Sequence, residues 1–374
     1  MSLTGHATVE GTARYRDRFK DRVAENHFRY EQDLWLSSIG LGTYLGSADE
    51  ATDANYTNAM VRAVEMGLNV IDTAANYRFQ RSERSIGEAL TQLTSKQDFS
   101  RDEMVICTKC GYLPFDGAPP RDVSTYIKET FVRPGIAKPE DFVGGSHCMK
   151  PAYLRHQLEQ SLRNTGLTCL DVYYVHNPES ELGFVSQAEF YARLRSAFEE
   201  MERSIAEGKI RMYGVATWNG FRVPSDSREY HSLSRMVELA REVGGDAHGF
   251  RFIQLPFNLA MTEALTLRNQ TIDGLEAGEQ VSVLEAAGAL GITMVASASI
   301  LQGRVAHGLP ESIREPLGGL ATDAQTAIQF VRSTPGINIA LVGMRKREHV
   351  EENLQLVHVE PVHPEDFSRM FLEE

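Results

Sequence analysis

The stretch NVIDTAANY, residues 69–77, begins as an apolar strand and then places Asp72 and Tyr77 a few residues apart. An ionised aspartate is costly to bury without a partner, so a strand that ends on a carboxylate requires a reason. In α/β proteins with parallel strands, catalytic groups are found at the strand ends. We therefore expect an active site here, if other strands supply partners for Asp72.

Seven further apolar stretches have the character of strands, and stretches of helical periodicity separate them. Several of those helical stretches, among them 56–67 and 153–166, end on Gly, as C-capped helices do. Eight strands alternating with eight helices predict a parallel sheet, and the eightfold count favours a closed (β/α)8 TIM barrel over an open doubly wound sheet. The expected strands are 35–46, 67–74, 103–110, 169–176, 210–217, 251–258, 291–299 and 337–344.

The chain has 374 residues, more than the roughly 250 of a simple barrel. The excess lies in the segment before Trp35 and in the stretch 110–149, which is rich in Pro and Gly and too long for a simple loop. No tandem repeat or shift of composition marks a second domain. We expect one barrel domain over 1–374, with an N-terminal extension and a long insertion after the third strand that serves as a functional lid.

Composition excludes several classes of protein. The net charge of -13 argues against nucleic-acid binding, which needs a basic surface. No run of about 18 apolar residues exists, so no membrane span is expected. The N-terminus is polar and has no apolar signal core, so we expect a cytoplasmic protein.

Two motifs that suggest other chemistry fail on their spacing. Cys107 and Cys110 form a C-x-x-C, but no second pair completes a zinc site, and strand alternation sends the thiols to opposite faces. We therefore expect no metal and interpret the four cysteines as core residues. GLGTYLG, residues 40–46, is G-x-G-x-x-x-G, and Asp72 follows too late to bind a ribose, which disfavours a Rossmann fold.

The expected strand ends bring together a chemically coherent set of side chains. A Tyr phenol has a pKa near 10, and a neighbouring Lys ammonium lowers it by stabilising the phenolate. A carboxylate keeps the Lys charged, and a neutral His can bond and orient a carbonyl oxygen. Together such groups protonate an oxygen as hydride arrives at carbon, which is carbonyl reduction. The candidates are Asp72, Tyr77, Lys109 and His176, with Gln254 on the sixth strand.

Each candidate also has a purely structural explanation. Alone, Asp72 would cap a loop, Tyr77 would be a rim aromatic, Lys109 a surface lysine and His176 a core histidine. Their occurrence together at matching strand ends favours the catalytic interpretation. His147 and Cys148 are interpreted as the junction of the insertion with the third helix. Three aromatic residues either line a substrate pocket or pack in the lid: Tyr112, Phe115 and Trp218.

The order of these motifs resembles the aldo-keto reductase superfamily over about residues 39–354. GLNVIDTAANY followed by SERSIGEAL is similar to the family segment that carries the catalytic Asp and Tyr, and VICTKCG is similar to the Lys strand. SLRNTGLTCLDVYYVHNP is similar to the segment leading to the His, and VGMRKREHVEENL to the C-terminal cofactor segment. The resemblance implies a TIM barrel that uses NADPH, with NADH as the alternative, to reduce an aldehyde or ketone.

The same resemblance implies roles for individual residues. Asp72, Tyr77, Lys109 and His176 form the catalytic tetrad, with Tyr77 as proton donor. Around the cofactor it implies that Asn177 and Gln254 hold the nicotinamide carboxamide, Gln302 and Gly303 the pyrophosphate, Arg345 the 2'-phosphate, and Glu352 and Asn353 the adenine. The implied cofactor set is Asn177, Thr217, Gln254, Ser297, Ile300, Gln302, Gly303, Gly343, Arg345, His349, Glu352 and Asn353.

Two positions depart from the family pattern. Ala216 and Thr217 stand after the fifth strand where the family usually has Ser-Asn, and Thr hydrogen-bonds less extensively than Asn. Ser297 stands where the family often has an aromatic residue that stacks on the nicotinamide, a role for which Trp218 is an alternative.

Two other functions stay open at this point. The same groups catalyse the oxidation of an alcohol or sugar when Tyr77 accepts the proton. A non-enzymatic regulatory subunit with a reductase-like barrel, as in potassium-channel β subunits, is the alternative from another class. The expected partner is a small carbonyl or alcohol substrate. A homo-oligomer is left open.

Overall fold

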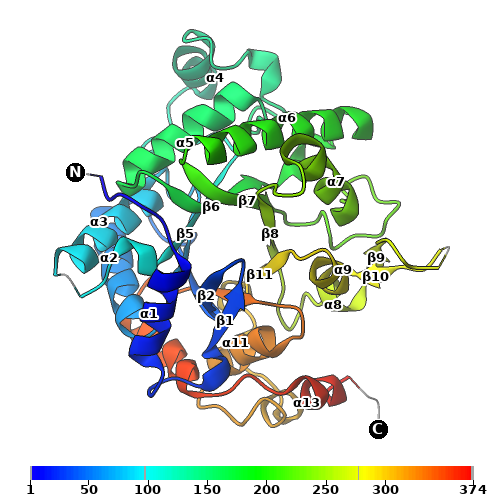
Figure 1. Ribbon diagram of the computed structural model, residues 1–374. Coiled ribbons are helices and arrows are strands. Elements are labelled where there is room, and N and C mark those ends of the chain that lie inside the picture. Colours follow the sequence, from blue (N-terminus) through cyan, green and yellow to red (C-terminus); the bar gives the residue numbers. More distant parts are fainter. Residues whose placement is uncertain (1, 97, 277, 372–374) are drawn as a thin grey trace.

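The strand pattern correctly predicts a (β/α)8 barrel. The computed structural model describes residues 2–96, 98–276 and 278–371. Eight strands pair in parallel and close in the order β11-β12-β3-β4-β5-β6-β7-β8, with helices around them (Figure 1). They are β3 (Ile39–Gly42), β4 (Val70–Asp72), β5 (Val105–Cys110), β6 (Leu170–His176), β7 (Ile210–Ala216), β8 (Phe250–Pro256), β11 (Thr293–Ser297) and β12 (Ile339–Gly343).

A main helix follows each barrel strand and covers the outside of the sheet. Local sequence sets their ends: Asp49 Oδ1 accepts the N–H of Thr52 at 2.7 Å to cap the first, and Gly166, with φ of 67°, terminates the third. These helices are α2 (Glu50–Glu65), α3 (Arg81–Ser95), α5 (Pro151–Thr165), α6 (Gln187–Ala206), α7 (Leu233–Gly244), α9 (Val283–Ala289), α11 (Asp323–Ser333) and α12 (Arg347–Asn353). Others are α1 (Val9–Phe19), α4 (Val123–Ile127), α8 (Glu263–Thr266), α10 (Glu311–Arg314) and α13 (Pro364–Arg369).

The N-terminal extension closes the amino-terminal end of the barrel. After α1, strands β1 (Phe28–Glu31) and β2 (Leu34–Ser37) form an antiparallel hairpin. Leu34 and Leu36 of this hairpin pack with the apolar side chains inside the barrel. The interior next to the hairpin is therefore mainly apolar, and the charged inward-facing residue Lys109 lies at the opposite, carboxyl end. The interior cluster contains Val70, Val105, Cys107, Val172, Tyr174, Ala216, Phe252, Val295, Ile339 and Leu341.

One expected strand, 35–46, covers parts of two separate strands, and the one expected at 67–74 is shorter, Val70–Asp72. The stretch 35–46 divides at Ser38, whose N–H donates to the carbonyl of His27 at 2.7 Å. The residues before it belong to the β1–β2 hairpin, and those after it form β3 of the barrel. The apolar pattern runs through the break because both strands bury side chains in the core. Periodicity alone therefore cannot show where one sheet ends and the other begins.

The insertion after β5 folds back on itself. Its two ends meet in an antiparallel bridge between Tyr112 and His147, and Cys148 N–H donates to the carbonyl of Gly111 at 2.9 Å. Its middle carries α4, and buried Phe131 packs its ring at 5.2 Å from that of Tyr153 on α5. Figure 1 shows α4 outside the ring of main helices, beyond α5. The insertion therefore has a core of its own on the outer helix layer.

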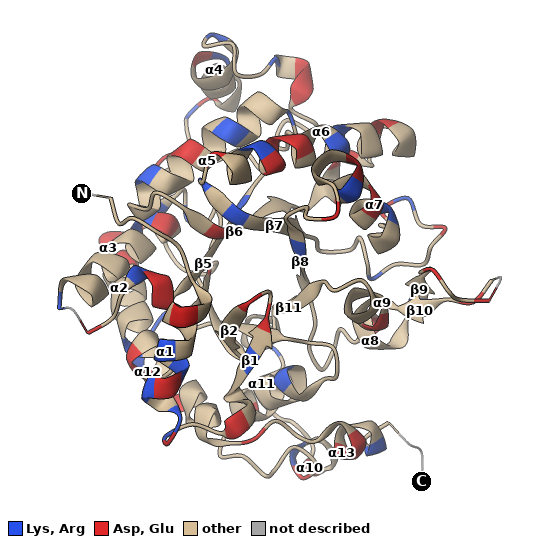
Figure 2. Ribbon diagram, in the orientation of Figure 1, with Lys and Arg blue, Asp and Glu red and all other residues tan. Residues whose placement is uncertain are grey.

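Surface charge is mixed rather than segregated. Figure 2 shows Lys and Arg interspersed with Asp and Glu along the outer helices, with no single-signed face in this view. Among the described residues, no helix combines the length and apolar character that crossing a membrane requires. All four cysteines are buried and free; Cys107 points into the barrel and Cys110 packs in the surrounding core, as strand alternation predicts.

Candidate active site

The carboxyl ends of four barrel strands bring polar side chains to one place. Asp72 is the last residue of β4, His176 is the last of β6, and Lys109 and Gln254 lie near the ends of β5 and β8. Lys109 continues the inward series of Val105 and Cys107, because side chains alternate along a strand. The set predicted from strand ends is therefore assembled at the carboxyl end of the barrel.

A buried ion pair forms the base of this site. Lys109 Nζ pairs with Asp72 Oδ1 and donates to the carbonyl of Thr73 at 2.8 Å. Gln254 Nε2 donates to the other carboxylate oxygen, Oδ2, at 2.9 Å. Lys109 is only 1% exposed, so its charge depends on these contacts. Buried charges persist only when paired and hydrogen-bonded, and here both members of the pair are.

Tyr77 lies directly above the ion pair. The centre of its ring is 5.0 Å from Lys109 Nζ, and its edge-to-face neighbour His176 lies at 5.9 Å between ring centres. The ring of Tyr44, in the loop after β3, lies 5.0 Å from that of Tyr77. Tyr77, Lys109, Asp72 and His176 thus share one cluster. Tyr44 was not predicted, since an aromatic residue in a loop gives no signal of its own.

The turn that presents Tyr77 is conformationally strained. The three residues after it, Arg78, Phe79 and Gln80, all have positive φ, at 48°, 58° and 69°. Left-handed geometry in a residue with a side chain costs energy and persists only where the surroundings enforce it. Here Arg78 Nε donates to the carbonyl of Ser47 at 2.9 Å, and its guanidinium pairs with Asp53 of α2. A buried arginine therefore fixes the turn that holds the phenol.

The electrostatics of the cluster favour a proton donor beside a neutral imidazole. Burial lowers the pKa of His176 well below 6.5, and the charges of Lys109 and His147 lower it further, so the ring is neutral near pH 7. Burial also lowers the pKa of Lys109, but the nearby charges of Asp72 and Tyr77 outweigh this effect and raise it. Burial raises the pKa of the Asp72 carboxyl, against the lowering effect of Lys109.

The pKa of Tyr77 differs in direction from the expectation. We expected the Lys109 charge to lower it, and this charge does act downward. Burial of the phenol is the larger effect, however, and the net pKa is raised above 10. The phenol consequently holds its proton at neutral pH, which is the state that a proton donor needs.

The expected cofactor segments leave neighbouring strands. Because β11 pairs with β12, the residues after both strands lie side by side at the carboxyl end. Arg345 forms no ion pair within the described residues. A Cβ on Gly46 would lie 3.3 Å from the Arg345 side chain, so the glycine leaves space for this arginine. Ser297 is the last residue of β11, and it is followed by Ile300 and by Gln302 and Gly303 in the short helix η6 (Leu301–Gly303). Gly343 is the last residue of β12, and it is followed by Arg345 and by His349, Glu352 and Asn353 on α12.

The remaining expected cofactor residues lie beside the tetrad. Asn177 directly follows His176, has φ of 44°, and donates its side-chain N–H to the Tyr112 hydroxyl at 3.3 Å. Thr217 is buried after β7, where its hydroxyl oxygen accepts the N–H of Gly220 at 2.8 Å. Trp218 is exposed by 43%. The residues around Asn353, whose buried Oδ1 has no partner among the described residues, fit a group that supplies a donor.

His147 reaches the site from the insertion. As expected, it lies at the junction with α5, but its Nε2 also lies 2.8 Å from the carbonyl oxygen of His176. No spacing in the sequence predicts this contact, because the insertion matches no regular element.

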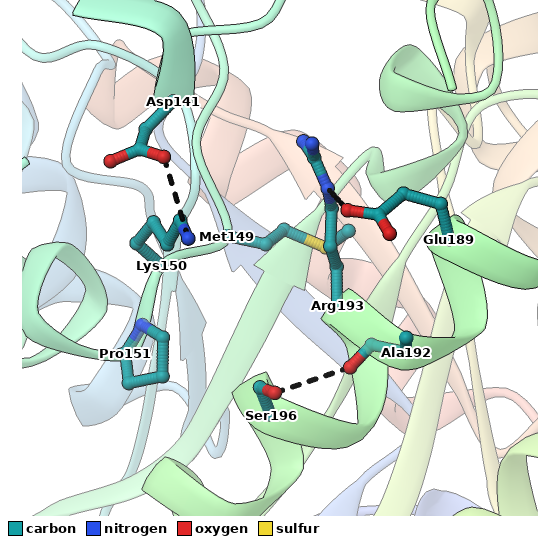
Figure 3. A pocket seen from close by; sticks show the side chains of 8 residues that line it. All are labelled: Asp141, Met149, Lys150, Pro151, Glu189, Ala192, Arg193 and Ser196. Carbon is teal, nitrogen blue, oxygen red and sulfur yellow. Dashed lines mark hydrogen bonds and ion pairs between the residues drawn. The ribbon is translucent and has the colours of Figure 1, made fainter. Parts of the chain in front are cut away.

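A separate hollow of about 200 Å³ lies outside the barrel, between the start of α5 and helix α6 (Figure 3). Lys150 pairs there with Asp141 at 3.4 Å, and Arg193 with Glu189 at 2.8 Å. Its lining comes from outer helices and the insertion rather than from barrel strand ends, so we do not assign it to the tetrad.

Comparisons with known proteins agree with this geometry. The model of the Aldo/keto reductase family matches residues 38–225, half of the chain, including all four tetrad positions. A Schizosaccharomyces pombe protein named as a candidate voltage-gated potassium channel subunit beta is 23% identical over 354 residues, 91% of this chain and 90% of that protein. The NADH-specific methylglyoxal reductase of Escherichia coli is 27% identical over 192 residues, 49% of each chain.

Solved structures show the same fold. The glycerol dehydrogenase of Gluconobacter oxydans matches with a TM-score of 0.63 at 19% identity, covering 93% of this chain and 94% of that one. An aldo/keto reductase from Klebsiella pneumoniae, in complex with NADP and acetate, matches with a TM-score of 0.60 at 20% identity over 93% and 94% of the two chains. The family match, the closed barrel and the cluster at its carboxyl end lead to one conclusion: this chain belongs to the aldo/keto reductase family of oxidoreductases.

Proposed function

We propose that this protein reduces an aldehyde or ketone to an alcohol with a nicotinamide cofactor, preferably NADPH, and that Tyr77 donates the proton. The observation that carries the proposal is the buried Lys109–Asp72 pair directly beneath Tyr77, with a neutral His176 at its side. A structural ion pair has no need of a phenol and an imidazole at a barrel mouth. Catalysis of proton transfer to oxygen needs all of them.

Each residue has a distinct part in this chemistry. A bound reduced nicotinamide supplies hydride to the carbonyl carbon. Tyr77 donates its proton to the carbonyl oxygen, and the Lys109 ammonium stabilises the phenolate that results. Asp72 and Gln254 hold Lys109 in place. Neutral His176 orients the carbonyl oxygen; its Nδ1 is buried without a partner among the described residues.

The residues after β11 and β12 are proposed to hold the dinucleotide. Backbone N–H groups around Gln302 and Gly303 suit a pyrophosphate, and Arg345 suits a 2'-phosphate, since a guanidinium bonds phosphate in a forked manner. The Klebsiella pneumoniae structure contains NADP, whereas the Escherichia coli relative is named NADH-specific, so Arg345 is the feature of this chain that favours NADPH.

Two other functions remain as alternatives. Oxidation of an alcohol uses the same residues in reverse and is supported by the likeness to a glycerol dehydrogenase. A regulatory subunit is supported by the Schizosaccharomyces pombe relative. The complete tetrad favours an enzyme, because a purely regulatory subunit does not need a buried proton donor.

A titration followed by a substrate panel tests the proposal. Protein fluorescence measures the Kd for NADPH and NADH, and absorbance at the nicotinamide band then follows oxidation of each with a panel of aldehydes and ketones. We expect tighter binding of NADPH and turnover with at least one carbonyl class. Binding of neither nucleotide would contradict the proposal, and turnover only with alcohols and oxidised cofactor would establish the reverse direction.

A further inference from the structure

We propose that His147, which the insertion contributes, is a positioning residue that fixes the catalytic histidine, His176, through its main-chain carbonyl. The proposal rests on the function proposed above and gives the insertion between β5 and α5 a part in the reaction. Four lines of evidence support it: the bonding of the imidazole, the end of the sheet ladder, the packing of Tyr112, and the shape of the chain at Gly111.

Both ring nitrogens of His147 have polar partners. Its Nε2 lies 2.8 Å from the carbonyl oxygen of His176, and its Nδ1 lies 3.1 Å from Glu181 Oε1. The carbonyl only accepts, so the ring donates its Nε2–H to His176, while Nδ1 faces the Glu181 carboxyl. Glu181 is completely buried, and its other oxygen accepts from Arg193 Nη1 at 2.9 Å. A continuous chain thus runs from α6 through Glu181 and His147 to the catalytic strand.

The sheet itself does not hold the carbonyl of His176. On the β7 side His176 stays in register with Ala216. On the β5 side the last register pair joins Cys110 to Val175, so this carbonyl lies beyond that ladder. Immediately afterwards Asn177 adopts φ of 44° and the chain turns sharply away. A catalytic residue at a strand end that is paired on one side only benefits from a second anchor, because small displacements of reacting groups lower rates strongly. The His147 N–H is that anchor.

The ring of Tyr112 packs against the imidazoles of both His147 and His176. Its ring lies edge-on to both, at 5.1 Å from the centre of His147 and 5.1 Å from that of His176. Its hydroxyl lies 2.9 Å from Ser180 Oγ, and its carbonyl accepts from Gln157 Nε2 at 2.7 Å. Hydrogen bonds therefore hold the tyrosine at its hydroxyl and at its main-chain carbonyl, with its ring packed against both imidazoles.

Gly111 allows the imidazole to approach. It has φ of 113°, and a Cβ at this position would lie 2.7 Å from His147 Nε2. A contact that short does not occur between real atoms, so only glycine permits the observed bond to His176. The proximity of His147 is also one of the causes, after burial and Lys109, that lower the pKa of His176.

Two variants separate this role from simple packing. Replacement of His147 by Leu fills the same space without donating a hydrogen bond. Replacement of Glu181 by Gln leaves the chain intact, because the amide oxygen accepts from Arg193 while the amide N–H donates to Nδ1 of a neutral His147. We expect H147L to lower kcat for the carbonyl substrate about 10- to 100-fold, with an unchanged Kd for NADPH, and E181Q to stay within about threefold of wild type.

A double-mutant cycle identifies the route of the effect. If His147 acts through His176, H147L costs nothing further in kcat when His176 is already replaced by Ala. Equal losses in both backgrounds would contradict the proposal and assign His147 a general packing role. Thermal unfolding of each variant confirms that the folded protein is compared.

Nuclear magnetic resonance of histidine-labelled protein keeps the test independent of turnover. We expect one set of His176 ring signals in wild type and E181Q, and shifted or multiple sets in H147L. Unchanged His176 signals in H147L would overturn the positioning role. A wild-type protein that shows these signals but reduces no carbonyl would contradict the proposed function alone.

Discussion

At the scale of single residues, the Lys109–Asp72 pair is the feature most sensitive to change. Removing one member of a buried ion pair leaves the other charge without compensation, which typically costs about 3–5 kcal/mol. We therefore expect K109M to lower the free energy of unfolding by about that amount, measured by urea denaturation. The apolar double variant D72L/K109M should recover most of the stability but no activity. A double variant as unstable as the sum of the singles would contradict this interpretation of the pair.

The pH dependence of reduction follows from two pKa shifts of opposite direction. His176 has its pKa well below 6.5 and stays neutral, while Tyr77 has its pKa above 10 and stays protonated. We expect kcat for carbonyl reduction to be nearly constant between about pH 6 and pH 9. The measurement is initial rate at saturating substrate and cofactor. A loss of activity below a midpoint near 6.5 would show that His176 titrates as a free imidazole does.

Sequence predicted the inward-facing residues of the site and Tyr77, but not the contacts that Tyr44 and His147 make from their loops. Asp72, Lys109, His176 and Gln254 follow from strand alternation and from the rule that strand ends meet at one edge. The contact of His147 with His176 depends on how the insertion folds, for which no periodicity exists. The direction of the Tyr77 pKa depends on burial, which the residue type alone does not reveal.

At the scale of elements, the strained turn after β4 links the outer helix α2 to the phenol. Asp53 of α2 pairs with both Arg78 and Arg81, at 2.5 Å for Arg81. We expect D53A to release the turn and lower kcat about tenfold, with little change in the Kd for NADPH, because the reacting phenol is displaced but the cofactor segments are not. Steady-state kinetics and fluorescence titration measure the two quantities.

A matched control exists at the other end of the barrel. Glu207 also joins two cations, Arg155 at 2.8 Å and Lys209 at 2.9 Å, but follows the end of α6. E207A should leave kcat unchanged, since exposed pairs contribute little. Equal effects of D53A and E207A on kcat would mean that the turn is not controlled by Asp53.

Element boundaries were predictable only where composition changes. Strands such as β6 and β8 lie within one residue or a few of their expected ranges, because Gly and polar residues flank them. The break at Ser38 has no such signal, and neither do the ends of the short helix α9 (Val283–Ala289), which lies within a longer stretch of helical periodicity, 279–291. Val281 and Ser282 fit the helical pattern, but they form strand β10 (Val281–Ser282), which pairs antiparallel with β9 (Arg268–Gln270).

At the scale of the whole molecule, stability depends on a histidine beneath the barrel. Burial, with the charge of Arg332, lowers the pKa of His27 to about 3, and its Nε2 lies 2.9 Å from the carbonyl of Gly67. In the unfolded chain the pKa of His27 is near 6.5. Below that pH the unfolded state therefore binds a proton that the folded state does not bind, which favours unfolding. We expect the free energy of unfolding to fall by about 2 kcal/mol from this group between pH 7.5 and pH 5.

Urea denaturation at the two pH values measures this difference. H27Q should lose that part of the pH dependence, and H307Q, at an exposed histidine, should retain it. An identical pH dependence in wild type and H27Q would show that His27 is not the group responsible.

Replacing Tyr77 by Phe removes only the phenol oxygen, so this one change separates the effect on proton transfer from the effect on cofactor binding. The decisive measurement is a comparison of wild type with Y77F, in which NADPH binding is followed by fluorescence and NADPH oxidation by absorbance with the best carbonyl of the panel. We predict that Y77F binds NADPH with a Kd within about threefold of wild type and loses at least about 100-fold in kcat. Reduction of the carbonyl by Y77F at the wild-type rate would contradict the assignment of Tyr77 as proton donor.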